Sequence, residues 1–268
     1  MGAYEYISEI SCECTLSGST GQVTDYRIFT VPVELETGQA LREAMEDILG
    51  AYDKGIWRVF AWDPDSSSYV EMDEPSFATL SVFPGRAFWG ITTATGMISF
   101  SGIPAPDGGY LEVPLSPGWN MVALPWPDTS ITIDNIAVSD GIFNYWVTST
   151  NNTLTHQYVW HYTGTGPSNG YTQLTTGATL TPGVGYWIKV LTTTSLTLLI
   201  PKDDAGGYFE ATSYRSSQGV SPTSEDTEEP PPPPGVTVDF QSSSGGTTVS
   251  GSGGCFVGTV SEGKSMGE

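Results

Sequence analysis

The 268-residue chain is 38% hydrophobic, which is enough for one large or two modest domains with real cores. Asp and Glu number 30 against 9 Lys and Arg, for a formal net charge of -21. Such a field repels phosphate backbones and anionic lipid surfaces, so we exclude nucleic acid as a partner, and no apolar run is long enough to span a bilayer.

Residues 1–23 have the composition of a strand segment, and we expect them to be the end of a truncated preceding unit. Cys12 and Cys14 alternate with Glu13, which puts both thiols on one face of a strand. Two thiols are half of the ligand set of a structural zinc, and three cysteines are too few for a disulfide framework. We therefore expect neither a zinc site nor a cofactor.

Residues 24–105 predict a β-rich unit with one helix. The segments YRIFTVPV, WRVFAW, SYVEM, AFWGIT and GMISFSG are rich in aromatic and β-branched residues and are bounded by turn formers, which is typical of short strands. The helix has Thr37 as a candidate N-cap and Gly50 as its stop. Its apolar residues recur at helical spacing: Leu41, Ala44, Met45, Ile48 and Leu49.

The stretch DPDSSS predicts a hairpin turn, but its acidic residues also suggest a metal loop. Asp63, Asp65, Ser67 and Glu74 fall at positions 1, 3, 5 and 12 of a calcium loop. Position 6, where the sharp turn of such a loop needs Gly, is Ser68, and both flanks have strand composition. A plain hairpin is the favoured interpretation, and calcium is the alternative.

Residues 106–200 repeat the first unit. SVFPGRAFWGIT is echoed by TLTPGVGYWIKV, so that the Pro-Gly turn and the following aromatic-Trp pair recur. TDYRIFTVP matches PGWNMVALP, VFAW matches VWHY, and Tyr69 matches Tyr171, in the same order with a slightly drifting offset. We therefore predict an all-β protein of two tandem homologous units of roughly ninety-five residues. Each unit is expected to be a small sandwich or barrel with a minor helix.

The aromatic-Trp pair marks the start of a strand in each unit. Because side chains alternate along a strand, Phe88 and Trp89 are expected to point to opposite faces. One ring then anchors the core of its unit, and the other faces solvent, the neighbouring unit or a ligand.

The composition changes after Lys202. Residues 201–254 form an acidic, Pro-rich and Gly/Ser-rich stretch with five prolines at 230–234 and few large apolar side chains. Such a stretch cannot bury enough apolar surface to order itself, so we predict a disordered, extended linker. The chain ends in a short motif at residues 255–268.

Two resemblances bear on function. The set PGWNMVALP, YVWHY and PGVGYWIKV resembles β-rich repeat segments of uncharacterised exported bacterial surface proteins. The C-terminus resembles a degenerate CFI-box, with matches at Cys255, Phe256, Thr259 and Gly263. These resemblances imply a secreted or cell-surface protein whose tail is a sorting or processing element. The start of the chain lacks a secretory signal, so we expect an exported protein of which this chain is a fragment, with a cytoplasmic protein as the alternative.

A search for chemistry finds no nucleophile elbow, zinc-protease motif or phosphate loop. Aromatic residues near turns are the remaining candidates for a site, because exposed rings can form a platform that stacks on sugars. The candidates for such a platform are Trp62, Trp126, Tyr162 and Tyr171.

The sequence therefore favours a non-catalytic structural or adhesive protein with no cofactor, whose partner is a carbohydrate or a cell-envelope component. A carbohydrate-binding module that uses exposed aromatic residues is the first alternative. A glycoside hydrolase that uses two acidic residues is the second.

Overall fold

The computed structural model describes residues 10–16, 25–94, 96–126, 128–166, 170–202, 228–234 and 255–256, with only the backbone described for 10–16, 96–97, 166 and 255–256. Within these ranges the chain consists mostly of short strands, which confirms the prediction of an all-β protein. No helix in the described ranges is long and apolar enough to cross a membrane. The elements are β1 (Ile10–Leu16), β2 (Arg27–Thr30), β3 (Val33–Glu34), α1 (Gly38–Leu49), β4 (Trp57–Asp63), β5 (Ser68–Glu71), α2 (Pro75–Ala78), β6 (Ala87–Thr92), β7 (Gly96–Pro104), β8 (Tyr110–Leu115), β9 (Gly118–Ala123), β10 (Ile131–Thr132), η2 (Ile133–Asn135), β11 (Ala137–Ser139), β12 (Asn144–Trp146), β13 (Val159–Gly166), β14 (Gly170–Leu174), β15 (Thr179–Leu180), β16 (Gly185–Val190), β17 (Leu196–Pro201) and β18 (Cys255–Phe256).

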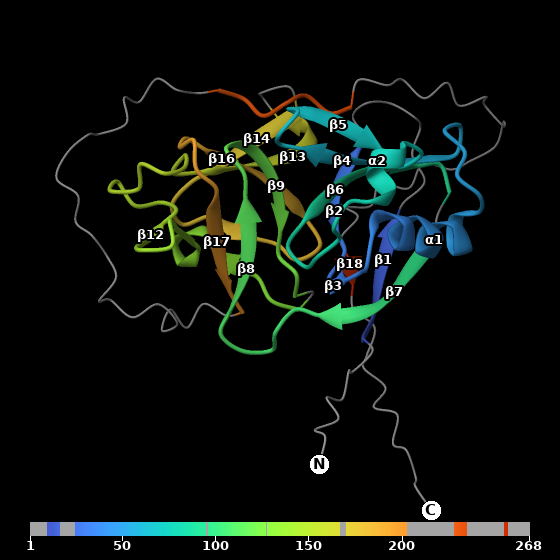
Figure 1. Ribbon diagram of the computed structural model, residues 1–268, viewed down its shortest axis with the longest axis horizontal. Coiled ribbons are helices and arrows are strands. Elements are labelled where there is room, and N and C mark those ends of the chain that lie inside the picture. The colour runs from blue at the N-terminus through green and yellow to red at the C-terminus, as the bar shows by residue number, and fades with distance from the viewer. Residues whose placement is uncertain are drawn as a thin grey trace, which may run out of the picture.

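The body has two halves, and each half is a sandwich of two sheets (Figure 1). In the first half, a main sheet of order β2-β6-β4-β5 faces a sheet of order β18-β1-β7-β3 across an apolar core that α1 also covers. In the second half, a main sheet of order β9-β16-β13-β14 faces a sheet of order β8-β17-β11-β12 across a second core. The short strands β10 and β15 pair separately.

The two main sheets correspond strand for strand. In chain order, the first, second, third and fourth strands of each half take the same places in its main sheet, and all pairs are antiparallel. Residues that match in the sequence also occupy matching positions in the ladders. The matched pairs are Ile28–Trp89 with Met121–Trp187, Phe60–Trp89 with Trp160–Trp187, and Trp62–Tyr69 with Tyr162–Tyr171.

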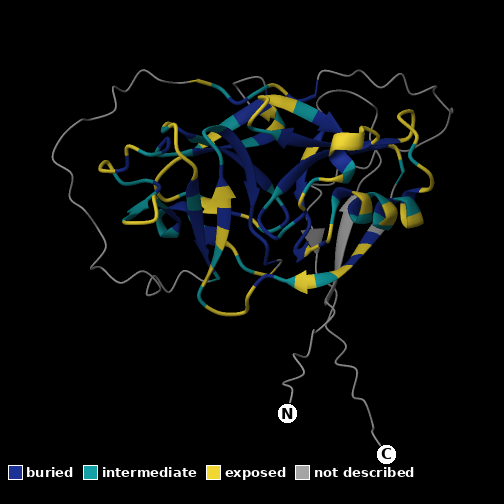
Figure 2. Cartoon of the chain, viewed as in Figure 1, coloured by how far each residue is buried: buried dark blue, intermediate teal, exposed yellow. Residues whose placement is uncertain are grey.

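A third apolar cluster, which we call the seam, fills the space between the two main sheets, whose strands are mostly dark blue in Figure 2. Phe88 and Tyr186 belong to the cores of their own halves, whereas Trp89 and Trp187 belong to the seam. The second ring of each pair was expected to face solvent, the neighbouring unit or a ligand. It faces the neighbouring half. The buried residues of the seam are Tyr26, Ile28, Phe60, Trp62, Ala87, Trp89, Ile91, Trp119, Met121, Ala123, Trp160, Tyr162, Tyr171 and Trp187.

Ring contacts across the seam are made twice in nearly the same geometry. The ring centroids of Trp89 and Tyr162 lie 4.8 Å apart at an interplanar angle of 79°. The matching contact, between Trp187 and Trp62, spans 5.3 Å at 79°. Such reciprocity is the property of a two-fold interface, in which residue i contacts j and j contacts i. A hydrogen bond from Trp62 Nε1 to the carbonyl oxygen of Trp119, 2.8 Å long, also joins the halves.

At Gly185 on β16 the two main sheets lie too close together for a side chain. A Cβ atom on Gly185 would overlap Cγ2 of Ile28 and would lie 2.9 Å from Cβ of Ala87. We expect Gly185→Ala to lower the free energy of unfolding by about 1–3 kcal/mol, because a well-packed core resists an inserted methyl group. Gly108→Ala is the control, since a Cβ there meets nothing within 4 Å and should change stability by less than about 0.5 kcal/mol. Denaturant unfolding measures both variants, and equal midpoints would contradict the close packing.

The predicted helix is confirmed as α1, with one difference on its apolar face. Oγ1 of Thr37 accepts a hydrogen bond from the amide of Ala40, and Gly50 ends the helix at φ 82°. Ile48 is 48% exposed, so it does not belong to the buried face that Leu41, Met45 and Leu49 form. At the corresponding place the second half has the single 3-10 turn η2.

The N-terminal strand β1 was expected to be the end of a preceding unit, but it belongs to a sheet of the first half. All seven residues of β1 pair with β7 of the first half, from Ile10 opposite Gly102 to Leu16 opposite Gly96. In the second half, β8 pairs with β17 in the same manner. The first half therefore includes β1, and the boundary expected at residue 24 lies inside this half.

Candidate functional site

A short stretch of the expected linker lies on the body. Residues 228–234, which we call the proline segment, run across both halves, above β14 and β5, and are coloured orange-red in Figure 1. Pro230, Pro233 and Pro234 are buried. The prediction of a disordered linker over 201–254 is therefore wrong for these residues, because the body supplies the apolar partner that the segment itself lacks. Residues 203–227 and 235–254 lie outside the described residues.

Two tyrosines from matching positions hold the proline segment, and we call them the tyrosine pair. Tyr69 on β5 lies opposite Trp62, and Tyr171 on β14 lies opposite Tyr162. Each ring packs edge-on against its partner across the hairpin, at centroid distances of 5.0 and 5.1 Å. Each hairpin thus contributes one tyrosine, at matching positions on the two sides of the seam.

The hydroxyl groups of the tyrosine pair donate to consecutive carbonyls of the segment. Tyr171 Oη lies 2.7 Å from the oxygen of Pro231, and Tyr69 Oη lies 2.8 Å from that of Pro232. Proline has no amide hydrogen, so a polyproline backbone offers only acceptors and needs donors from its partner. Trp89 Nε1 donates to Tyr69 Oη at 3.2 Å, which leaves the hydroxyl hydrogen of Tyr69 for the segment.

The surroundings keep both hydroxyls protonated. Burial raises the pKa of Tyr69 and of Tyr171 well above the ordinary value for tyrosine. A phenol that does not ionise stays a hydrogen-bond donor, as the carbonyl acceptors require. The tyrosine pair is therefore suited to binding and not to acid-base chemistry near neutral pH.

The burial pattern from Pro230 to Pro233, where the chain bends, fits a polyproline II helix. Pro230 and Pro233 are both buried, whereas Pro232 between them is exposed. A polyproline II helix has three residues per turn, so residues three apart share a face. Aromatic grooves that receive this helix are a recurring mode of peptide recognition.

A lysine binds the N-terminal end of the segment. Lys189 on β16 forms an ion pair with Glu228, and its Nζ lies 5.6 Å from the centroid of the Trp119 ring. The Lys189 ammonium lowers the pKa of Glu228. Because Lys189 side-chain exposure is only 17%, this contact is less screened than a fully exposed pair. Lys189 and the tyrosine pair together form what we call the groove.

The expected platform of exposed rings is wrong. Trp62, Tyr162 and Tyr171 belong to the seam and are at most 7% exposed. Trp126 is 4% exposed in the core of the second half, where its Nε1 donates to the carbonyl of Pro106 at 3.0 Å. These rings fill the space between sheets because two small sandwiches need large side chains to join them. Of the four, Tyr171 does reach a ligand, but through its hydroxyl.

The calcium alternative is also contradicted. Asp63 Oδ1 accepts the amide of Asp65 at 3.1 Å, inside the β4–β5 hairpin, where Ser67 takes a φ of 49°. Glu74 accepts the amide of Glu71 at 2.9 Å and so caps a different turn. The four residues do not converge, and no cluster of three metal-ligating side chains occurs within the described ranges. The favoured hairpin is confirmed by the pairing of Asp63 with Ser68.

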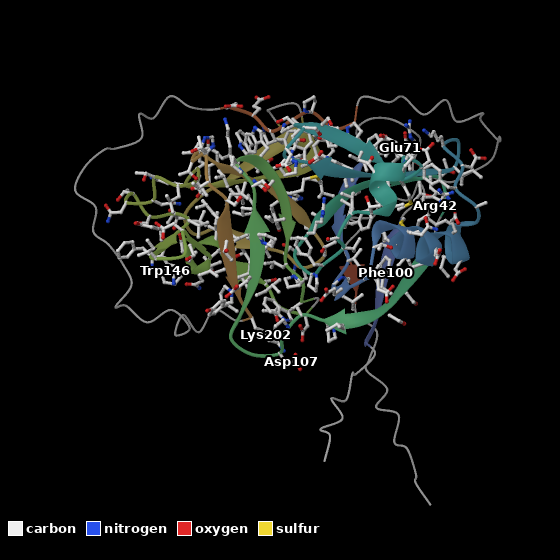
Figure 3. All side chains as sticks on the ribbon, in the orientation of Figure 1. Arg42, Glu71, Phe100, Asp107, Trp146 and Lys202 are labelled. Carbon is white, nitrogen blue, oxygen red and sulfur yellow. The ribbon has the colours of Figure 1, made fainter. Side chains whose placement is uncertain are left out.

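A buried ion-pair cluster lies beside the first main sheet, where Figure 3 labels Glu71. Both carboxylate oxygens of Glu71 accept from Arg58, at 2.7 and 2.8 Å. Tyr52 Oη and Lys54 Nζ complete the shell at 2.7 and 2.8 Å. Burial would raise the pKa of Glu71, but hydrogen bonds from Arg58, Lys54 and Tyr52 outweigh it and lower that pKa. A carboxylate so fully satisfied is a structural element of the fold.

The C-terminal motif is described only in part. Cys255 and Phe256 form β18, which pairs with β1 so that Cys255 lies opposite Cys14. Thr259 and Gly263 lie outside the described residues. The sorting role remains a prediction.

Comparison of the chain with protein-family models, with curated proteins and with solved structures gives no match.

The sequence singled out Tyr171 only as part of a stacking platform, and it did not indicate that Tyr69, Lys189 and the proline segment belong to one site with it. A signal was present, since Tyr69 and Tyr171 match between the units and a run of acceptor-only residues follows in the tail. What the sequence does not contain is the packing of the two hairpins side by side.

Proposed function

We propose that this chain is a non-catalytic structural and binding protein whose groove holds an extended proline-rich segment. The hydrogen bonds from Tyr69 and Tyr171 to consecutive proline carbonyls support this proposal most directly. Because one tyrosine comes from each half, the bound segment also ties the halves together.

We further propose that the two halves arose by duplication of one β unit and that the protein works outside the cell, at a bacterial surface. The matched ladders of the two main sheets support the duplication. The net charge of -21 and the resemblance of the repeats to exported surface proteins support the location. A partner in the cell envelope fits this setting.

The double variant Tyr69→Phe/Tyr171→Phe tests the proposed groove. It keeps both rings and removes both donors, so we expect the proline segment to open about tenfold or more often, since each hydrogen bond contributes about 1 kcal/mol. A Glu-specific protease, with mass spectrometry of the fragments, measures cleavage of the Glu228–Glu229 bond, which tracks the open population.

Tyr145→Phe is the matched control, because Tyr145 lies half-buried on β12 at the edge of another sheet. This variant should cleave at the wild-type rate. If the double variant also cleaves at the wild-type rate, the tyrosine pair does not hold the segment and the proposed function fails.

A further inference from the structure

The groove contacts the main chain of the proline segment through the tyrosine pair and one of its side chains through Lys189. The tyrosine pair binds main-chain carbonyls, which every proline-rich chain offers. Lys189 contacts a side chain, that of Glu228, and so depends on which residue stands there. Ligand choice therefore depends on this second contact.

The position of Glu228 relative to the clamped carbonyls defines a motif. Glu228 lies three residues before Pro231, whose carbonyl Tyr171 binds. Three residues are one turn of a polyproline II helix, a rise of roughly 9 Å. Lys189 thus contacts a residue three positions before the one whose carbonyl Tyr171 binds.

The charge of the site favours an acidic residue at that position. Lys189 is held over the Trp119 ring and is largely covered by its neighbours. A cation in such a place attracts a carboxylate and repels another cation. With a formal net charge of -21, the rest of the chain opposes acidic ligands in general. Recognition of this one acid therefore depends on the charge of Lys189, while the Trp119 side chain adds a hydrogen bond to Glu228.

We infer that the groove is a binding site for proline-rich segments of a second protein chain, that it selects those with an acidic residue three positions before the clamped carbonyl, and that Lys189 sets this selectivity. Residues 228–234 occupy the groove as an intramolecular competitor. This inference rests on the proposed function, because it assigns a ligand class to the same groove.

The competitor acts through its high local concentration. A tethered ligand holds its site at an effective concentration in the millimolar range for short flexible connections, so an outside segment must compete with it. Weakening the resident segment should therefore uncover the site. Replacing Pro230, Pro231 and Pro232 with Gly in the full chain keeps the carbonyls but adds freedom to the unbound segment, and each such change opposes docking.

The test is fluorescence anisotropy with two labelled peptides, EDTEEPPPPPGV and EDTKKPPPPPGV, in 50 mM and in 300 mM NaCl. We expect the acidic peptide to bind the Pro230→Gly/Pro231→Gly/Pro232→Gly variant about tenfold more tightly than it binds the wild type. In low salt it should bind about three- to fivefold more tightly than the basic peptide, and high salt should reduce this ratio.

Lys189→Glu in the same opened variant gives the decisive comparison. A reversed preference, with the basic peptide now the tighter ligand, is a result that loss of folding cannot produce. Tyr69→Phe/Tyr171→Phe should weaken both peptides equally, since it removes the contacts that are common to them.

Two outcomes separate this inference from the proposed function. If the wild-type segment is protected from the Glu-specific protease but the opened variant binds neither peptide, the groove serves its own segment alone and the inference is overturned. Equal binding of both peptides before and after Lys189→Glu overturns the role of Lys189. If the wild-type segment is not protected from the protease at all, the proposed function itself is overturned.

Discussion

Trp89→Ala and Trp187→Ala should each lower the free energy of unfolding by about 3–5 kcal/mol. Both rings are 0% exposed, and each packs against a ring of the other half. The cavity left behind lies between two sheets that the remaining rings hold apart, so it cannot close readily. Urea or guanidinium unfolding followed by circular dichroism measures the change.

Trp146→Ala is the control for these two variants. Trp146, labelled in Figure 3, lies half-buried on β12, away from the seam. Trp146→Ala should lower the free energy of unfolding clearly less than Trp89→Ala or Trp187→Ala does. If Trp89→Ala and Trp187→Ala cost no more than Trp146→Ala, the seam does not join the halves.

Glu71→Gln should destabilise the protein by about 3–5 kcal/mol, because it leaves the buried guanidinium of Arg58 without its anionic partner. The side chains of Glu71 and Arg58 are only 9% and 7% exposed. Asp73→Asn removes an ion pair from the same lysine, Lys54, at a site that is 36% exposed, and should cost about 1 kcal/mol or less.

The same carboxylate makes stability depend on pH. The folded pKa of Glu71 lies below its ordinary value of 4.5, so the folded state binds this proton less tightly than the unfolded chain does. Its contribution is complete above about pH 4.5 and is lost as the pH falls through the folded pKa. Glu71→Gln should therefore flatten the acid limb of the stability profile, whereas an unchanged limb would contradict the role of Glu71.

Local structure could be predicted from the sequence because its causes are local. The helix α1 follows from apolar spacing and from the caps at Thr37 and Gly50. The β4–β5 hairpin follows from the turn composition of DPDSSS. Phe88 and Trp89 lie on opposite faces of β6 because side chains alternate with a period of two along any strand.

The site could not be predicted because it depends on how the halves meet. Composition alone cannot tell whether Trp62 faces water or another sheet, and here the other sheet covers it. The same limit applies to the five prolines. A proline run has little side-chain entropy to lose, so it docks readily once a surface of matching shape and donors exists. That surface exists only after both hairpins are in place.

The groove takes one tyrosine from each half, and this has a mechanical consequence. A force that slides the halves apart would draw Tyr69 away from Tyr171, so the two hydrogen bonds to the ligand could not both be kept. Conversely, any ligand that fills the groove favours the joined arrangement of the two halves by mass action.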